Sequence, residues 1–269
     1  MTDPLPTIWN PDQRIGDMLK GNRGLVVGVA NADSIAFGAA AKLRAFGADL
    51  AVTWLNDKAE PHVRPLAEQL GAEITMKLDV ETPDEMEAVF ERLTRDWGKL
   101  DFVIHSIAFA PRADLHGRVI DCSADGFAQA MRVSCWSFLR MAKLAEPIMA
   151  AGGVLVTMSY YGADKVVANY NIMGPVKAAL EASVRYAAAE LGPSGIRVFT
   201  VSPGPLRTRA ASGIAQFDEL IAEAKERAPA QRLVDIAEVG RVVAFLVSGA
   251  SSGMTGDTIY VDAGLHNVA

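Results

Sequence analysis

The chain has few of the residues that mark several classes of protein. It contains 269 residues with only two cysteines, Cys122 and Cys135, and four histidines scattered along its length. Two cysteines do not form a disulfide framework, and the histidines show no metal-ligand spacing, so the sequence predicts neither a disulfide scaffold nor a metal site. We expect both cysteines to be small buried hydrophobic side chains.

Long apolar runs and an excess of positive charge are also missing. No apolar run approaches the roughly 18 residues that a membrane span needs, and the N-terminal residues lack the basic and apolar segments of a signal peptide. The net charge of −6 offers no general attraction to nucleic acid or to anionic membranes. We therefore expect a cytoplasmic globular protein with no nucleic-acid or membrane partner.

A regular alternation of short apolar segments and longer amphipathic segments fills most of the chain. The alternation predicts parallel strands with helices on both faces. The predicted strands cover residues 25–30, 49–54, 73–78, 101–105, 153–158, 196–201 and 258–261, and the predicted helices cover 35–46, 60–70, 83–96, 123–150, 171–191 and 236–248. With right-handed crossovers, the simplest fold is a Rossmann-type, doubly wound α/β sheet of about seven strands in a single domain.

The domain organisation is predicted to be simple, because we find no internal repeat and no linker-like stretch. We expect an irregular arm over residues 1–20 and one dinucleotide-binding catalytic domain over 21–269. Residues 203–232 interrupt the alternation with turn formers and small residues, followed by a helical pattern. Long insertions at the carboxyl ends of strands are often binding loops, which predicts a substrate lid there, with an ordinary surface connection as the alternative.

The first predicted strand leads into a segment that suits a nucleotide. Gly28 permits close approach of the backbone, and Ser34 stands where the next helix begins, so that it can cap the helix or donate to a phosphate. Asp79 follows the third strand, where it can bind an adenine amino group or only cap a turn. Ser106, after the fourth strand, leaves room for a cofactor. A tight strand–helix turn explains the Gly28 segment equally well.

Tyr170 and Lys177 stand seven residues apart in the segment YNIMGPVK. On one helix that spacing places both side chains on the same face. An ammonium beside a phenol stabilises phenolate and lowers the tyrosine pKa, so Tyr170 can serve an oxygen that gains charge while Lys177 binds a ribose. The pair predicts hydride transfer from a nicotinamide, with a tyrosine near a solvated lysine as the alternative. Tyr160 either lines the substrate site or is an aromatic residue that only packs against its neighbours.

Four segments resemble the enoyl-acyl carrier protein reductases, a divergent branch of the short-chain dehydrogenase/reductases. They are the glycine and serine pattern at 28–38, HSIAFAP at 105–111, residues 159–186 and GPLRTRAASGI at 204–214, and the likeness extends over about 20–263. The resemblance implies hydride transfer from nicotinamide to a trans-2-enoyl thioester in fatty acid biosynthesis, by a homotetramer. It implies that Tyr170 stabilises the enolate, that Lys177 holds the ribose and that Tyr160 contacts the thioester end.

The same resemblance implies further contacts by position. Cofactor contacts are implied at Gly28, Ser34, Ile35, Asp79, Val80, Ser106, Lys177, Leu206 and Thr208, and substrate contacts at Ala108, Tyr160 and Met173. One departure bears on the cofactor, because Leu55 stands where the family often has Gln and no basic residue occupies 55 or 56. NADH is therefore favoured over NADPH, with Lys58 and Arg64 as the alternative clamp for a 2′-phosphate.

Two other departures leave the substrate open. Residues 215–219 are neutral to acidic where some family members are basic, which would repel an acidic carrier protein, so a coenzyme A thioester stays an alternative. SPGP at 202–205 is closer to carbonyl-reducing relatives, which use a Ser–Tyr–Lys set, but the position of that serine holds Thr157 here. A short-chain carbonyl reductase and a non-catalytic nucleotide-binding relative are the competing interpretations.

Overall fold

One parallel sheet organises the protein. The computed structural model describes residues 18–149, 152–208 and 217–268. Seven strands pair in the order β3-β2-β1-β4-β5-β6-β7, and every pairing is parallel. The strands are β1 (Arg23–Val27), β2 (Asp49–Trp54), β3 (Ile74–Lys77), β4 (Phe102–His105), β5 (Gly153–Met158), β6 (Ile196–Pro203) and β7 (Thr258–Val261). The predicted doubly wound sheet is confirmed, and its strand order is that of dinucleotide-binding folds.

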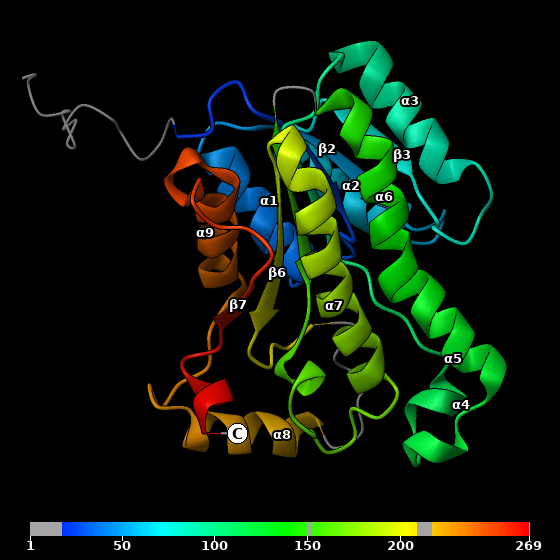
Figure 1. Cartoon of the computed structure of the whole chain (residues 1–269), viewed down its shortest axis with the longest axis vertical. Helices are drawn as coiled ribbons and strands as arrows, with labels where there is room; N and C mark the ends of the chain where they lie inside the picture. The colour runs from blue at the N-terminus through cyan, green and yellow to red at the C-terminus, as the bar shows by residue number, and fades with distance from the viewer. Residues whose placement is uncertain (1–17, 150–151, 209–216, 269) are drawn as a thin grey trace, which may run out of the picture.

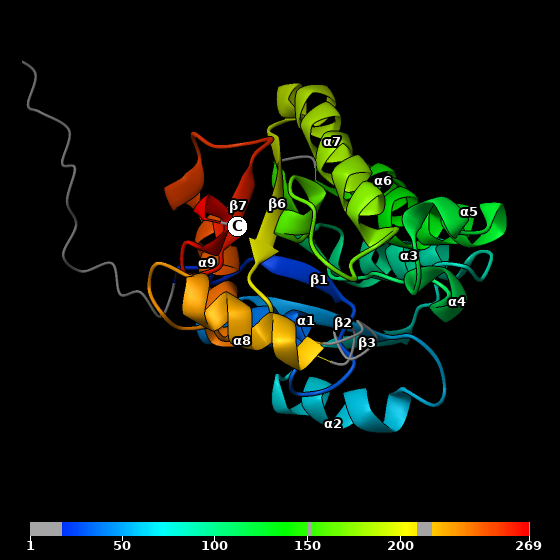
Figure 2. The same cartoon turned by 90° about the horizontal axis from the view of Figure 1, so that it is seen from below.

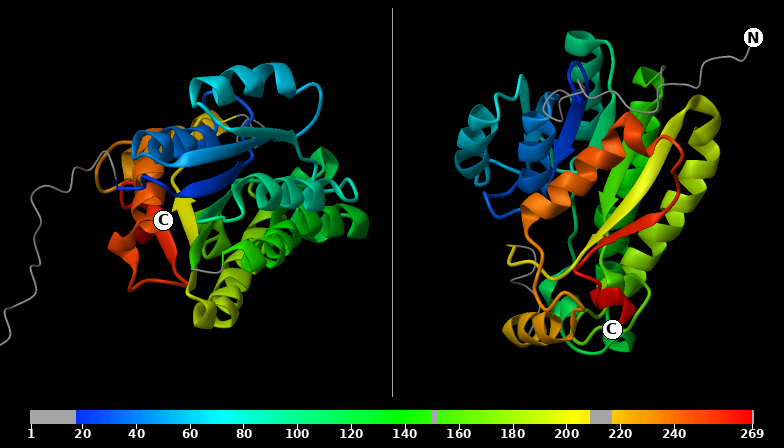
Figure 3. Two further views of the ribbon diagram at one scale, coloured as in Figure 1. Left: turned by 90° about the horizontal axis from the view of Figure 1, so that it is seen from above. Right: turned by 90° about the vertical axis from the view of Figure 1, so that its left-hand side faces the viewer.

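Helices cover both faces of the sheet (Figures 1 and 2). One layer contains α1 (Ile35–Ala45), α2 (Glu60–Gln69) and α9 (Ile236–Val247), and the other contains α3 (Glu85–Trp97), α6 (Ser137–Ala145) and α7 (Met173–Leu191). Figure 3 shows β6 and β7 between α9 and α7. Because successive strand residues point to opposite faces, Val26 joins the core under α1 while Leu25 and Val27 join the core under α3 and α7.

Two glycines allow α1 and α9 to touch through their backbones. A Cβ on Gly38 would lie 2.5 Å from the carbonyl oxygen of Ile236, and a Cβ on Gly240 would lie 2.3 Å from the carbonyl oxygen of Gly38. Only glycine fits either position without a shift of backbone. This contact fixes α1, and with it the helix N-terminus that follows β1.

The predicted helix over 123–150 is not uniform. It consists of α5 (Ala124–Met131), a π-helical turn (Arg132–Trp136), α6 and a 3₁₀ turn (Glu146–Ile148). Two serine hydroxyls form hydrogen bonds with backbone groups at this turn. The Ser137 hydroxyl donates to the carbonyl of Val133 at 2.6 Å. The Ser134 hydroxyl accepts from the N–H of Phe109 and donates to its carbonyl. Side chains that bond backbone in this way disturb the regular ladder, and π turns of this kind are frequent at functional sites.

The predicted arm and lid are covered only in part. Residues 1–17 and 209–216 lie outside the described residues, and Leu19, which falls within the predicted arm, is fully buried in the core. The helical pattern within the predicted lid is α8 (Phe217–Arg227), and a short α4 (Arg112–Leu115) follows β4. Among the described residues, no helix combines the length and the apolar character that crossing a membrane requires.

Candidate active site

The floor of the site lies where the strand order reverses, between β1 and β4. Gly28 and Ser106 follow these two strands, and the Ser106 N–H donates to the carbonyl of Val27 at 3.0 Å. Gly28 has a φ of 103°, and a Cβ there would lie 2.1 Å from the carbonyl oxygen of Ser106. The two backbones therefore meet with no side chain between them. In open α/β sheets this crevice is where a nucleotide binds.

The N-terminus of α1 adjoins this crevice. Ser34 caps the helix, because its hydroxyl accepts from the N–H of Phe37 at 3.4 Å and donates to the carbonyl of Asn31 at 2.7 Å. Ile35 is the first helical residue, and the first N–H groups of a helix have no partner inside it. These groups and the helix dipole suit a pyrophosphate. Of the two roles expected for Ser34, the structure shows the cap.

Asp79 and Val80 follow β3 at the same edge of the sheet. One carboxylate oxygen of Asp79 accepts from the N–H of Glu81 at 3.0 Å, which is the turn-capping role. Its second oxygen is left for a ligand such as an adenine amino group, while Val80 packs against the core. After β6, Leu206 packs against the other core, and its carbonyl accepts from the N–H of Thr208 at 2.8 Å.

Tyr160 and Tyr170 meet edge to face, with ring centroids 4.9 Å apart. Met173 belongs to the same buried cluster as Tyr170, so three of the predicted site residues lie together. The expectation that Tyr170 and Lys177 share one helix is wrong, because α7 begins at Met173. Tyr170 instead sits in a turn between Asn169 and Asn171, whose φ angles of 62° and 47° are left-handed, a conformation that Asn tolerates well.

The charge state of the two tyrosines differs from the expectation as well. Burial raises the pKa of Tyr170, and the negative charge of Glu181 adds to this effect. Burial also raises the pKa of Tyr160, reinforced by the neighbouring Tyr161. The expected lowering of the Tyr170 pKa by Lys177 is not what the structure gives. Both phenols are therefore neutral.

Lys177 is buried, and its Nζ donates to the carbonyl of Met158 at 2.7 Å. Burial lowers the pKa of Lys177 to about 8. An ammonium carries three hydrogens, and this bond uses one of them. Within the described residues, the hydroxyls of Tyr160 and Ser202 are buried without a hydrogen-bond partner of good geometry. Buried polar atoms normally have partners, so this edge of β5 and β6 fits a polar ligand.

Thr157 and His105 form a closed pair beside the site. The His105 Nε2 lies 2.9 Å from the Ser137 hydroxyl, which already donates to the carbonyl of Val133, so we assign the proton to Nε2. The Thr157 hydroxyl then donates to Nδ1 at 2.8 Å. Burial lowers the pKa of His105 to about 3, so the ring is neutral. The hydroxyl of Thr157 is consequently occupied inside the protein.

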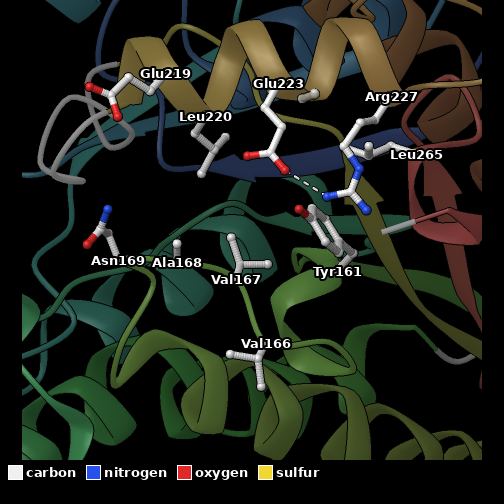
Figure 4. Close-up of a pocket in the computed structure, with 11 residues that line it drawn as sticks. Tyr161, Val166, Val167, Ala168, Asn169, Glu219, Leu220, Glu223, Arg227 and Leu265 are labelled. Atoms are coloured by element: carbon white, nitrogen blue, oxygen red, sulfur yellow. Dashed lines mark hydrogen bonds and ion pairs between the residues drawn. The ribbon is translucent and has the colours of Figure 1, made fainter.

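A cavity of about 310 Å³ lies beside the tyrosines, between the loop after β5 and α8 (Figure 4). Tyr161 forms part of its wall, and its ring centroid is 4.6 Å from that of Tyr160. Apolar walls come from Val167 and Leu220, while Glu223 and Arg227 form an ion pair at 2.7 Å on its rim. Ala108 is exposed in the loop after β4. The cavity has a size that suits a small-molecule site.

The strand order, the glycine crevice and the buried lysine define a dinucleotide-binding α/β protein. A sequence model of the family described as "Enoyl-(Acyl carrier protein) reductase" matches residues 28–266. The enoyl-[acyl-carrier-protein] reductase [NADH] 1 of Rhizobium meliloti is 47% identical over 251 residues, which are 93% of this chain and 92% of that protein. The chain belongs to the enoyl-(acyl carrier protein) reductase family.

Solved structures agree with the sequence comparison. The Anaplasma phagocytophilum reductase in complex with NAD is 43% identical with a TM-score of 0.91, covering 95% of this chain and 98% of that one. The Bacillus cereus reductase with NADP+ and indole naphthyridinone is 42% identical with a TM-score of 0.92, covering 94% and 99%. These structures are similar to the present one along nearly their whole length.

Two polar residues of the site were not identified from the sequence. The Ser159 hydroxyl donates to a carboxylate oxygen of Glu181 at 2.6 Å, directly before Tyr160 in the chain. The available signal was spacing, because Glu181 follows Lys177 by four residues on a helix and so shares its face. Nothing in the sequence marks Ser159 as the partner, because the contact joins the end of β5 to α7.

We predict that His105 makes stability depend on pH. Above the ordinary pKa of 6.5 the ring is neutral in both states, whereas below it the unfolded chain takes up a proton that the folded chain refuses until about pH 3. The free energy of unfolding should then fall by about 1.4 kcal/mol per pH unit from this residue alone. Urea unfolding of wild type and His105→Asn between pH 7.5 and 4.5 tests this.

The difference in unfolding free energy between the two proteins should shrink as the pH falls below 6.5. His116→Asn, which changes an exposed histidine, is the control and should follow wild type. All proteins are compared at one protein concentration. A difference that stays constant between pH 7.5 and 5 would contradict the burial argument.

Proposed function

We propose that the protein reduces the trans-2 double bond of enoyl thioesters with NADH, as a step of fatty acid biosynthesis. The observation that carries the proposal is the contact of Tyr160 with Tyr170 at the carboxyl edge of the sheet, where Lys177 is buried behind β5. Relatives across 92% or more of this chain are named enoyl-[acyl-carrier-protein] reductases [NADH].

The residues present fit a dinucleotide. Gly28 leaves the crevice floor open, the N-terminus of α1 suits the pyrophosphate, and the two remaining hydrogens of Lys177 suit ribose hydroxyls. By position, Ile35, Val80, Leu206 and Thr208 would line the same edge. When bound, the cofactor supplies the hydride that adds to the β carbon of the substrate.

The tyrosines would serve the oxygen end of the substrate. As the β carbon accepts hydride, negative charge develops on the thioester oxygen, and a neutral phenol can donate a strong hydrogen bond to it. Tyr170 is suited to this role because burial raises its pKa and keeps its proton in place. Tyr160 presents a second buried hydroxyl next to that of Tyr161. Met173 and Ala108 would border the acyl chain.

The end of β2 favours NADH over NADPH. Leu55, which follows Trp54 at the end of the strand, is 52% exposed and cannot hydrogen-bond a ribose or a phosphate. Arg64 is one of the two basic residues named above as an alternative clamp for a 2′-phosphate. It forms an ion pair with Glu60, and its guanidinium carbon lies 5.0 Å from the centroid of the Trp54 ring. The nearby carboxylate offsets the guanidinium charge. The preference for NADH proposed for this chain rests on Leu55 and Arg64, and the structure of the Bacillus cereus relative contains NADP+.

The carbonyl-reductase alternative is weakened by Thr157. In that mechanism a hydroxyl at this position assists the substrate oxygen, but here the hydroxyl donates to His105 in a fully buried site. Tyr160 offers the hydroxyl instead. Reduction of a carbon–carbon double bond is therefore the better fit.

The thioester carrier is proposed to be acyl carrier protein, following the names of the relatives. The described part of α8 is acidic at its start, but its charges are partly paired, with Asp218 bonded to Arg207 and Glu223 bonded to Arg227. Pairing reduces the repulsion of an acidic partner that the sequence predicts. A coenzyme A thioester is the alternative substrate in the assays below.

We predict that Gly28→Ala weakens NADH binding. The new Cβ would collide with the carbonyl of Ser106 and would occupy a left-handed conformation. Overpacking of this kind costs about 1–3 kcal/mol, so the Kd should rise by roughly 5- to 150-fold. Gly21→Ala is a matched control, because Gly21 has a φ of 82° but no atom within 4 Å of its Cβ position. Fluorescence titration with NADH measures both, and equal affinities would contradict the placement.

We predict that Tyr170→Phe loses turnover by roughly 100-fold or more, because the proton donor to the developing oxygen charge is removed. NADH oxidation is followed with enoyl thioesters of acyl carrier protein and of coenzyme A, and with the matching 3-oxoacyl thioesters. Tyr186→Phe, which changes an exposed tyrosine on α7, is the control. Normal turnover by Tyr170→Phe would contradict the role proposed for Tyr170. A wild-type preference for 3-oxoacyl over enoyl thioesters would support carbonyl reduction instead.

We also propose a homotetramer. The stretch from α5 through α6 exposes large apolar side chains, including Phe127, Trp136 (51% exposed) and Leu139, which a solitary chain would leave in water. Trp136→Glu should shift the sedimentation velocity towards smaller species, while Val166→Glu, on an exposed loop, should not. A wild-type protein that sediments as a monomer contradicts the proposal.

A further inference from the structure

Two side chains of α7 hold the end of β5. Lys177 donates to the carbonyl of Met158 at 2.7 Å, and the hydroxyl of Ser159 donates to Glu181 at 2.6 Å. The lysine and the glutamate are one helical turn apart and lie on the same face. The two residues that immediately precede Tyr160 are therefore attached to one helix, through a carbonyl and a hydroxyl.

Other strands complete this attachment. The N–H of Ser159 donates to the carbonyl of Val201 on β6 at 2.8 Å, and the Glu181 carboxylate also accepts from Thr258 on β7. Ser159 is buried, so its hydroxyl has no access to bulk water. Glu181 thus joins α7, the end of β5 and β7 at one carboxylate, and Tyr160 extends from this point into the site.

Glu181 is also the acidic neighbour of a buried cation. Its charge favours the ammonium form of Lys177 and opposes the burial that lowers the pKa of Lys177 to about 8. Cys135 in the π-helical turn acts on the pKa of Lys177 in the same direction as Glu181, and the charge of Lys177 adds to the burial that lowers the pKa of His105 on β4. The other ionisable groups that face the carboxylate are Arg185 on α7, Asp164 in the loop after β5, Tyr260 on β7 and Tyr170.

We propose that Glu181 is a positioning residue for the reduction. Through Ser159 it fixes the backbone that carries Tyr160, and through its charge it keeps Lys177 an ammonium that can bind the cofactor ribose. The proposal rests on the function proposed above. It assigns two separable actions to one carboxylate, a hydrogen bond and a charge.

Three variants separate these actions. Glu181→Gln keeps an oxygen that accepts from Ser159 but removes the charge, Ser159→Ala keeps the charge but removes the bond, and Glu181→Ala removes both. Glu190→Gln changes an exposed carboxylate further along α7 and is the control. Circular dichroism and thermal unfolding first establish that each protein is folded.

In Glu181→Gln the pH above which NADH affinity is lost should be lower than in wild type by about one unit, because an opposite charge near the ammonium is gone. Ser159→Ala should keep the wild-type pH profile for NADH and lose about tenfold in kcat with the enoyl thioester, since a misplaced catalytic group costs rate rather than cofactor affinity. Glu181→Ala should show both effects. If it does not fold, the two conservative variants decide.

An unchanged pH limit for NADH in Glu181→Gln overturns the charge role, and wild-type kcat in Ser159→Ala overturns the hydrogen-bond role. NADH titration by fluorescence measures the pH limit without any turnover. If wild type binds NADH but reduces no enoyl thioester, the proposed function fails while the comparison of pH limits still tests the pairing of Glu181 with Lys177.

Discussion

The parallel pairing of β1 with β4 is the constraint on which the rest of the site depends. These strands are distant in sequence, and β2 and β3 continue the sheet on one side of them while β5 to β7 continue it on the other. Their carboxyl ends must therefore diverge into helices on opposite faces, which opens a crevice. Gly28 lies against the carbonyl of Ser106, so the floor of the crevice at this point is backbone with no side chain. Asp79, Tyr160 and Leu206 follow neighbouring strands that end at the same edge, while Lys177 comes from α7.

Burial then decides the chemistry of the groups at this edge. Taking an ionisable side chain out of water favours its neutral form. Burial raises the pKa values of Tyr160 and Tyr170, so both phenols are neutral. It lowers the pKa values of His105 and Lys177, so the imidazole is neutral and the ammonium loses its proton more easily. The function proposed above would use the two phenols as neutral donors and Lys177 as a cation. Because burial lowers the pKa of Lys177, a nearby negative charge favours its ammonium form, and Glu181 on the same helix supplies such a charge.

The sequence predicted the sheet and the edge where the site lies, because apolar periodicity and short turns are local properties. It predicted Tyr160, Tyr170 and Met173 as neighbours through resemblance to a family, and the structure places these three side chains together. It misjudged the position of Tyr170, because left-handed turns at Asn169 and Asn171 are not visible as a helical pattern. The π-helical turn was also missed, because it depends on hydrogen bonds of Ser134 and Ser137 within the folded chain.

Hydroxyl groups show most clearly why sequence alone does not assign roles. Thr157 and Ser159 both flank Met158 at the end of β5, and either side chain has the chemistry to assist a substrate oxygen. Thr157 and Ser159 are two residues apart, so the alternation along a strand would place both on the same side, and spacing alone does not tell which partner each one meets. In the structure Thr157 turns to His105 and Ser159 turns to Glu181, so both hydroxyls are used by the protein. In the reduction proposed above, Tyr160, the next residue along, would offer a buried hydroxyl in place of that of Thr157, and this would distinguish a double-bond reductase from a carbonyl reductase built on the same sheet.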